Sequence, residues 1–271
     1  MLEFCNSFPD KELGKKFSEF TQEFEKNVYI IIHIIWNLSA LCDIIARMIE
    51  YVVPSNIDSR ITAKAARILA EGGLIALPTD TSWNLVCSLK SRAGIKKLRK
   101  LSGERDERHF TLLCSDISQF GELCSVDNSR FRLIKRLSPG PYVFILKSLS
   151  GTEKALEIRR QEIGVRIPDH NIPLVLIKTL AHPLYSITAK KSMLTEAEAR
   201  YAEGEPASNG DELPPIPEED LFEGGWELED IDGVDMVIDD GEERERVFST
   251  ILNISGEDIN LIRKGAGPWP A

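Results

Sequence analysis

Hydroxyl and guanidinium groups in separate parts of the chain could bind a negatively charged ligand. Thr79 and Thr81 flank Asp80 where an apolar run ends, so their hydroxyls either contact a ligand or hold a turn. Arg166 lies inside an apolar segment, where a charge without a partner is costly. It binds a carboxylate or phosphate in a cavity, or it pairs with an internal acid, and we favour the ligand. For Arg263, which follows two apolar residues, a ligand contact and a structural role are equally open.

The segments around these residues alternate between strand and helix patterns. Asp58 and Ser59 can cap a helix whose apolar residues share one face, and Gly72-Gly73 ends it. The spacing predicts helices over 60–71, 92–101, 117–124, 128–137 and 172–181. It predicts strands over 74–78, 109–114, 142–148, 163–168, 183–189, 234–239, 248–254 and 259–263, and a mobile, charged stretch over 150–161. This alternation favours a layered α/β domain with a mixed sheet.

The net charge of −10 is distributed unevenly along the chain. Residues 196–232 hold 14 acids and one base, whereas residues 58–195 hold 23 bases and 13 acids. Because the acidic segment is also proline-rich, we expect it to form a solvated loop. The remaining body can attract phosphates, although its bases could equally be ordinary solvated helix faces.

Residues 1–47 differ from the rest of the chain. Their apolar stretch is interrupted by polar residues, whereas a membrane-spanning helix needs about 20 apolar residues. We interpret this segment as an appended helix or an over-extended translation start, and we expect no membrane association for 48–271. The five cysteines form no Cys-x-x-Cys pair, so we expect a reducing compartment, the cytoplasm, and no protein-bound metal.

Three groups of motifs carry a family resemblance. Residues 72–85 read GGLIALPTDTSWNL, which is similar to a GG-x-(hydrophobic)-PTDT-x-YGL opening. Residues 139–146 read PGPYVFIL, and the strand at 163–168 reads IGVRIP. Near the end of the chain, FSTILN at 248–253 precedes LIRKGAG at 261–267. In this order the motifs resemble the YrdC-like family.

The resemblance covers about residues 60–267, and HFTLLC at 109–114 followed by Val126-Asp127-Asn128 looks closer to its YciO branch. It implies a YrdC/YciO-like domain over 48–271, with an acidic loop inserted at 196–232. The implied fold is a twisted, open, mixed α/β sheet with a concave basic cavity. The family's best-understood members make threonylcarbamoyl-AMP from L-threonine, bicarbonate and ATP for tRNA modification, and members have been described as binding double-stranded RNA.

In that reaction, the threonine amine captures bicarbonate as a carbamate, whose oxygen attacks the α-phosphorus of ATP and expels pyrophosphate. The protein must then position the reactants and stabilise charge, for which hydroxyls and guanidinium groups are suited. The resemblance assigns no catalytic residue. The residues that we expect to bind substrate or nucleotide are Thr79, Thr81, Arg105, Arg108, Arg166, Ser186, Thr188, Lys190, Ser249, Thr250 and Arg263. Among them, Arg105, Arg108 and Lys190 are candidates to replace cations of the family pattern that this chain lacks.

The chain departs from the family pattern at three places. Synthases carry Lys-x-Arg before the strand at 109–114, where this chain reads Ser102-Gly103-Glu104, with Arg105 and Arg108 displaced. Their Ser-x-Asn after the strand at 183–187 is Thr188-Ala189-Lys190 here. The glycine expected after the aromatic residue of the opening motif is Asn84, a residue that tolerates positive φ.

These departures leave several functions open. One is an enzyme that uses ATP, with Mg²⁺, in threonylcarbamoyl-AMP synthesis or a related adenylate reaction. The second is a binding module for a nucleotide or double-stranded RNA, with little turnover. The third is a scaffold with a vestigial cavity. No aromatic residues interleave with the bases of 92–108, so sequence-specific RNA reading has little support.

Overall fold

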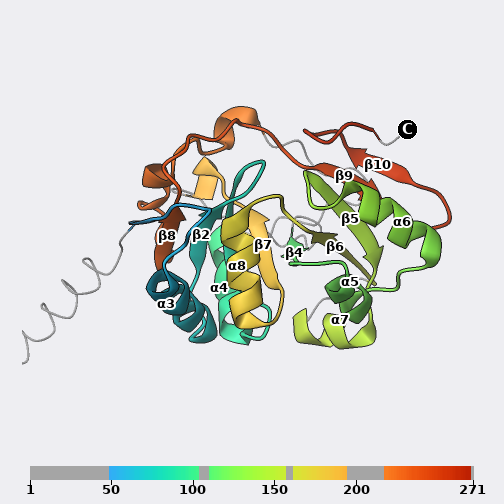
Figure 1. The fold of residues 1–271 in the computed structure, drawn as a ribbon, viewed down its shortest axis with the longest axis horizontal. Helices are drawn as coiled ribbons and strands as arrows, with labels where there is room; N and C mark the ends of the chain where they lie inside the picture. Colours follow the sequence, from blue (N-terminus) through green and yellow to red (C-terminus); the bar gives the residue numbers. More distant parts are fainter. Residues whose placement is uncertain (1–48, 104–109, 157–160, 194–216, 270–271) are drawn as a thin grey trace, which may run out of the picture. The chain divides into compact units, whose positions relative to one another are not determined.

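Apolar segments that alternate with amphipathic helices fold into one twisted sheet covered by helices (Figure 1). The computed structural model describes residues 49–103, 110–156, 161–193 and 217–269, and all of them belong to one compact unit, Arg47–Ala271. The predicted appended segment 1–47 lies outside the described residues, as do Arg105 and Arg108.

The described residues form a ten-stranded sheet in the order β1-β8-β2-β3-β7-β4-β6-β5-β9-β10. Its strands are β1 Ile49–Tyr51, β2 Ile75–Pro78, β3 Trp83–Ser88, β4 Thr111–Leu113, β5 Tyr142–Lys147, β6 Glu162–Arg166, β7 Leu184–Thr188, β8 Met236–Asp239, β9 Thr250–Asn253 and β10 Asn260–Arg263. Strands β4 and β6 are parallel, as are β5 and β9, whereas β3 and β7 are antiparallel. The predicted mixed sheet is therefore confirmed.

The helices begin and end at residues suited to these positions. They are α3 Ser59–Ala70, α4 Arg92–Ser102, α5 Ser118–Leu123, α6 Asn128–Leu137, α7 Ser150–Leu156 and α8 Asn171–Leu180. The Asp58 side chain caps α3, as expected, and Ser91 caps α4 by accepting from the backbone of Gly94. Gly103 ends α4 with φ of 65°, a left-handed conformation that favours glycine. No helix among the described residues is long and apolar enough to cross a membrane.

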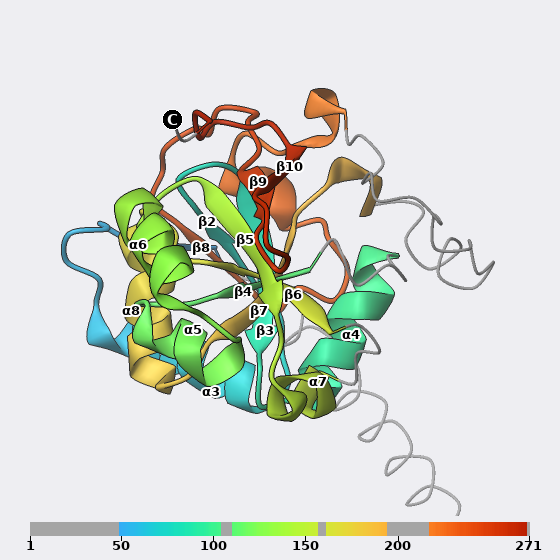
Figure 2. The same cartoon turned by 90° about the vertical axis from the view of Figure 1, so that its right-hand side faces the viewer.

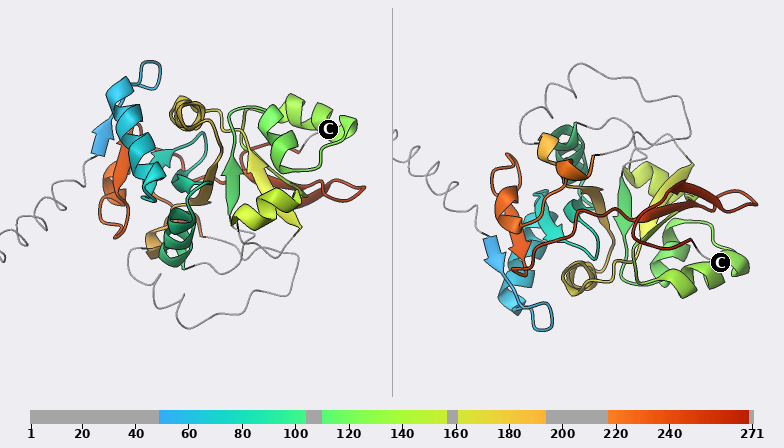
Figure 3. Two further views of the ribbon diagram at one scale, coloured as in Figure 1. Left: turned by 90° about the horizontal axis from the view of Figure 1, so that it is seen from below. Right: turned by 90° about the horizontal axis from the view of Figure 1, so that it is seen from above.

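Two apolar layers cover opposite faces of the sheet. Helices α3 and α8 pack side by side on one face, next to β2, and their apolar residues join Leu77, Val86 and Leu184 in one core cluster (Figure 1). Helices α4 to α7 contribute to the other cluster, around Phe144 and Tyr185. Figure 3 shows α3 and α4 on opposite sides of the strands. Because α3 and α8 lie next to β2, the first face is left open towards β5 and β9, which lie near the other end of the sheet, where β10 is the edge strand (Figure 2).

The structure contains two strands and one helix that the spacing did not predict. Strand β3 is buried at all six positions, so it lacks the alternation that marks a half-exposed strand. Strand β1 has three residues and pairs with β8 at the sheet edge. The stretch 150–161, predicted as mobile, begins instead with helix α7, which buries Thr152 and Leu156. The Thr152 hydroxyl donates to the carbonyl of Leu123, which fixes the start of this helix.

The prediction of a solvated loop over 196–232 is wrong for its last part. Residues 217–232 form the short 3-10 helices η3 Glu218–Asp220 and η4 Gly225–Leu228, and bury four apolar side chains, Leu221, Phe222, Leu228 and Ile231. Another 3-10 helix, η2 Lys191–Met193, follows β7. Acidic side chains between the apolar ones remain exposed, so a segment can be acidic overall and still pack. Residues 196–216 lie outside the described residues.

Candidate functional site

A pocket lies on the open part of the sheet face, across β3, β7, β4, β6, β5 and β9. Its polar wall consists of three cations, four hydroxyls and one amide, namely Arg166, Lys190, Arg263, Thr111, Ser186, Thr188, Ser249 and Asn84. Its remaining wall consists of Gly164 and apolar residues, namely Leu113, Val143, Ile145, Ile187 and Ile251. The pocket therefore offers positive charge and hydrogen-bond donors beside an apolar surface.

The Arg166 guanidinium is the centre of the polar wall. Arg166 is 3% exposed, and its Nη2 lies 2.6 Å from the Asp80 carboxylate. Its Nη1 donates to the Ser249 hydroxyl at 2.6 Å and to the Thr81 hydroxyl at 3.0 Å, and its Nε donates to the Gly140 carbonyl at 3.2 Å. Burial lowers the pKa of Arg166 and the Asp80 charge opposes this shift. Arginine has five N–H donors and four are used here, so one remains for a ligand.

These contacts make the face concave. Asp80 and Thr81 belong to the turn between β2 and β3, whereas Arg166 ends β6 and Ser249 immediately precedes β9. Three strands, β3, β7 and β4, lie between β2 and β6 in the sheet order. The twist of the sheet and the reach of the β2–β3 turn together place these side chains in contact. Hydroxyl and guanidinium groups from distant parts of the chain therefore meet at one pocket.

Arg263 supplies a second guanidinium. Its Nε and Nη2 donate to the Ser249 carbonyl at 3.3 and 3.1 Å, and its Cζ lies 4.7 Å from the centre of the Phe248 ring. Among the described residues, no carboxylate forms an ion pair with Arg263. Burial, followed by repulsion from Arg166, lowers the pKa of Arg263 to about 10. An anion in the pocket would offset this repulsion.

Strand β7 and the two residues after it present three polar residues to the pocket at alternating positions. Ser186, Thr188 and Lys190 share one face because successive side chains of a strand point to opposite sides. The Ser186 hydroxyl donates to the Thr111 carbonyl at 2.8 Å, and Lys190 is 5% exposed. Lys190 also forms a backbone bridge with Leu221.

The backbone beyond Lys190 is held by the 217–232 segment. The Asp220 carboxylate accepts from the Ser192 amide at 2.7 Å and from its hydroxyl at 2.9 Å. Lys191 pairs with Glu227 at 2.8 Å. Part of the segment predicted to be a solvated loop therefore positions a pocket residue.

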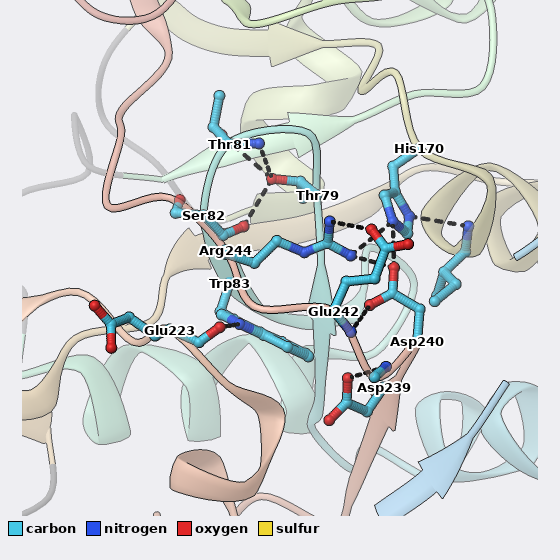
Figure 4. Close-up of polar contacts among 12 residues, drawn as sticks. Thr79, Thr81, Ser82, Trp83, His170, Glu223, Asp239, Asp240, Glu242 and Arg244 are labelled. Carbon is cyan, nitrogen blue, oxygen red and sulfur yellow. Dashed lines mark hydrogen bonds and ion pairs between the residues drawn. The ribbon is translucent and has the colours of Figure 1, made fainter. Parts of the chain in front are cut away.

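A second group of charges, His170, Asp240 and Arg244, lies beside the β2–β3 turn (Figure 4). His170 Nδ1 accepts from the Ile172 amide at 3.3 Å, and its Nε2 lies 3.1 Å from both the Asp240 carboxylate and Arg244 Nη2. Arg244 pairs with the same carboxylate, which is 2% exposed. Burial, followed by repulsion from Arg244, lowers the pKa of His170, so this imidazole stays neutral near pH 7.

Two predicted ligand contacts have structural roles here. The Thr79 hydroxyl donates to the Ser82 carbonyl at 2.7 Å and accepts from the Thr81 amide, so it holds the turn, which was the alternative considered. The Thr250 hydroxyl donates to the Gly267 carbonyl at 2.5 Å and accepts from the Gly265 amide at 3.0 Å. Neither threonine lines the pocket. Thr81 reaches it only through Arg166 and Ser249.

Other predicted residues do come together. Arg166, Ser186, Thr188, Lys190, Ser249 and Arg263 all line the one pocket. Arg166 pairs with the internal acid Asp80, which is one of the two interpretations, and it also lines the pocket, so a ligand contact stays a prediction. Ser102, which the family resemblance places where synthases are expected to carry lysine, is fully buried and donates to the Arg99 carbonyl at 2.8 Å.

Sequence reasoning missed three contributors to the site. Asp80 was seen only as the centre of a turn, although a buried arginine elsewhere signals the need for an acid. His170 follows the Arg166 strand and precedes an apolar helix, a position typical of a helix cap. Asn84 was interpreted only by the backbone conformations that it tolerates, whereas it lines the pocket.

The described site contains no activated nucleophile. Burial raises the pKa of the thiols of Cys87, Cys114 and Cys124, so these cysteines stay protonated, and none of them lines the pocket. The lining hydroxyls have no basic histidine within hydrogen-bonding distance among the described contacts. The arrangement is suited to binding anions, positioning them and stabilising developing negative charge.

Comparisons with known proteins point to one family. Residues 67–203 match the family model Sua5_yciO_yrdC, which carries the description "Telomere recombination". YciO of Escherichia coli (strain K12) is 28% identical over 218 residues, covering 80% of this chain and 95% of YciO. The crystal structure of E. coli YciO matches with a TM-score of 0.65 and 25% identity, over 82% of this chain and 97% of that one.

Two further relatives have assigned activities or ligands. Threonylcarbamoyl-AMP synthase of Idiomarina loihiensis (strain ATCC BAA-735 / DSM 15497 / L2-TR) is 31% identical over 153 residues, covering 53% of this chain and 81% of the synthase. Sua5 of P. abyssi, crystallised with L-threonine, shares the fold with a TM-score of 0.63 at 22% identity, over 80% of this chain and 58% of that one. The chain described here belongs to the Sua5/YciO/YrdC family, which includes the threonylcarbamoyl-AMP synthases.

Proposed function

We propose that the pocket binds ATP, with its Mg²⁺ ion, next to L-threonine, and that the chain forms threonylcarbamoyl-AMP from L-threonine, bicarbonate and ATP. The observation that carries this proposal is the pair of guanidinium groups, Arg166 and Arg263, that line the pocket together with Lys190. Arg166 pairs with Asp80, and Arg263 has no carboxylate partner among the described residues, so the two guanidinium groups carry more positive charge than this one carboxylate offsets. Membership of a family that includes such synthases supports the choice of substrates.

The pocket offers each reactant in this proposal a suitable surface. The carboxylate of L-threonine and the phosphates of ATP would lie against the three cations, which form charge-assisted hydrogen bonds with such groups. The carbamate formed from the amine and bicarbonate attacks the α-phosphorus, and pyrophosphate leaves. No covalent bond to the protein is required, in keeping with a site that lacks an activated nucleophile. The complex of P. abyssi Sua5 with L-threonine adds support for an amino acid ligand.

The test is an activity measurement on the purified full chain. With ATP, MgCl₂ and bicarbonate present, we expect pyrophosphate release to depend on added L-threonine and to fall in Arg263→Gln. Lys264→Gln is the matched control, because Lys264 is exposed and adjacent in sequence but does not line the pocket. Threonine-independent release, or none at all, would reject the synthase proposal.

A second candidate is a module that binds a nucleotide or double-stranded RNA without turnover. The observation that favours it is Ser102, which is buried and bonded to Arg99 where synthases carry a phosphate-binding lysine. For this candidate, the chain should bind an RNA duplex with an affinity that falls steeply as salt rises, because phosphate binding releases counterions. Salt-independent or undetectable RNA binding would reject the RNA form of this candidate.

The cellular setting of the proposal follows from the same chemistry. A synthase of this type supplies an activated intermediate for tRNA modification, so a tRNA-modifying partner is part of the first candidate. We propose the cytoplasm as its compartment, because the three described cysteines are free and buried, as expected where thiols stay reduced.

A further inference from the structure

Asn84 is the one pocket residue whose side chain carries a buried acceptor without a partner in the described structure. It is the second residue of β3 and pairs in register with Thr188 on β7, so the two side chains are neighbours on the pocket face. Asn84 is 6% exposed, and its Oδ1 has no hydrogen-bond partner. Buried amide oxygens are normally bonded, because leaving one unsatisfied is costly. An acceptor left open on a pocket wall is therefore available to a ligand.

The surrounding charges restrict which ligand group can fill that position. Arg166, Lys190 and Arg263 attract an anion and repel a cation, so an ammonium group is disfavoured on this wall. Asn84 Oδ1 accepts a hydrogen bond and so requires a donor on the ligand. The donor that meets both conditions is uncharged, namely a hydroxyl or an amide-type N–H on a molecule that also carries an anionic group.

The position of Asn84 makes this contact specific to the chain. The opening motif of the resembling family has glycine here, which offers no side-chain acceptor. Asn84 does not take the positive φ that would explain a glycine or asparagine on backbone grounds. The side chain of Asn84, rather than its backbone conformation, therefore distinguishes this position from one occupied by glycine.

We infer that Asn84 is a specificity-determining residue that accepts a hydrogen bond from the hydroxyl of an anionic ligand. This inference rests on the proposed function, in which L-threonine places its carboxylate against the guanidinium groups. L-threonine has two further polar groups, a charged ammonium and an uncharged hydroxyl, and the hydroxyl is the donor that fits beside Asn84. Asn84 then selects threonine over valine, which has nearly the same shape and carries a methyl group in place of the hydroxyl.

The experiment measures binding of L-threonine, L-valine and sulfate to the full chain by calorimetry. The variants are Asn84→Leu, which keeps the bulk and removes the acceptor, and Asn84→Gly, which restores the family residue. Asn56→Leu is the matched control, because Asn56 is exposed and lies outside the pocket. Sulfate has no hydrogen-bond donor, so its affinity measures the contribution of the pocket cations alone.

We expect the wild type to bind threonine about tenfold more tightly than valine, and this preference to be smaller in both Asn84 variants, because relatives with glycine here use L-threonine without this acceptor. Sulfate affinity should change less than about twofold, and the melting temperature of Asn84→Leu should equal or exceed that of the wild type, because a buried unsatisfied amide is removed. A structural role for Asn84 would lower the melting temperature instead, which would contradict the inference.

Other outcomes separate the two proposals. Threonine binding that is equally strong in both Asn84 variants would overturn the role of Asn84 and leave the proposed function standing. An equal loss of threonine and valine binding would show that Asn84 contacts the ammonium group, which also overturns the inference. A wild type that binds sulfate but neither amino acid would overturn the inference together with the L-threonine part of the proposed function.

Discussion

Arg166 and Asp80 form an ion pair of 2.6 Å between the end of β6 and the turn that joins β2 to β3. The pair connects parts of the sheet that three other strands separate, so it supports the curvature of the pocket as well as its charge. Its arginine is almost completely buried, whereas the Asp80 side chain is 15% exposed.

Removal of one partner of this pair should destabilise the fold. Arg166→Ala leaves the Asp80 carboxylate and the hydroxyls of Thr81 and Ser249 without their donor, and we expect a loss of about 3–5 kcal/mol in the free energy of unfolding. Urea denaturation of Arg166→Ala, Asp80→Ala and the double variant measures the coupling. The double variant should lose less than the sum of the two single losses, and additive losses would show that the pair is not coupled.

Arg263 should affect ligand affinity more than stability. It has no carboxylate partner among the described residues, so Arg263→Gln removes positive charge without leaving an unpaired acid. We expect ATP affinity to fall about tenfold, which corresponds to one charge-assisted hydrogen bond. We expect the free energy of unfolding to fall by about 1 kcal/mol, because contacts with the Ser249 carbonyl and the Phe248 ring are lost.

Calorimetric titration with ATP and urea denaturation separate these two effects. Lys264→Gln removes a neighbouring exposed charge and should change the affinity less than about twofold. Equal losses of affinity in the two variants would indicate a general charge effect rather than a bound phosphate or carboxylate.

His170 should make stability depend on pH. Because the pKa of His170 is lowered in the folded protein, the unfolded chain binds a proton that the folded chain does not bind. The free energy of unfolding should therefore decrease as pH falls below about 6.5, the ordinary histidine value, until the folded pKa is reached. Above that window His170 contributes no pH dependence.

Urea denaturation between pH 5 and pH 8 tests this dependence. His170→Gln keeps a polar side chain beside Asp240 and removes the titration, so the difference between wild type and variant isolates His170 from the carboxylates. The wild type should lose more stability on acidification than the variant. Parallel pH profiles would contradict the lowered pKa.

Gly265 should tolerate no side chain, because the backbone that precedes β9 lies against it. A Cβ at this position would lie 2.2 Å from the Phe248 carbonyl oxygen and 2.5 Å from the Ser249 carbonyl carbon. Backbone atoms cannot rotate away, so Gly265→Ala should cost about 1–3 kcal/mol in the free energy of unfolding and displace Ser249 from Arg166. Gly256→Ala is the control, since no atom lies within 4 Å of a Cβ there, and it should be nearly neutral.

Thermal unfolding of both glycine variants measures their stability, and sulfate binding measures whether the pocket is intact. Gly265→Ala should lower both the melting temperature and the sulfate affinity. Equal melting temperatures for the two variants would contradict the close backbone approach.

The sequence was informative where a motif has a local cause. Asp58 before a helix and Gly72 after it fix those boundaries, because capping depends on neighbouring residues only. Arg166 in an apolar strand predicted a buried cation that contacts a ligand or an internal acid. The structure places this side chain on the pocket wall. These signals can be seen without knowing which strands pair.

Contacts between distant residues could not be predicted in this way. The partner of Arg166 lies 86 positions away, and nothing near Asp80 distinguishes an ion-pair carboxylate from a turn residue. Strand β3 is buried at all six positions, and Val86 lies between Asn84 and Ser88 on the same face, so its pattern has no strict period of two. Phe222 and Leu228 are single apolar residues among acids, and only the tertiary structure shows that they pack.

The pocket can bind a ligand only late in the synthesis of the chain, because its residues come from widely separated positions. Its lining runs from Asn84 to Arg263, and β5 gains its parallel partner β9 only when nearly the whole chain has been made. Until then, β5 presents an unpaired edge, and the second guanidinium has not yet emerged from the ribosome. A nascent or truncated chain that stops before β10 would therefore have a sheet but no complete binding site.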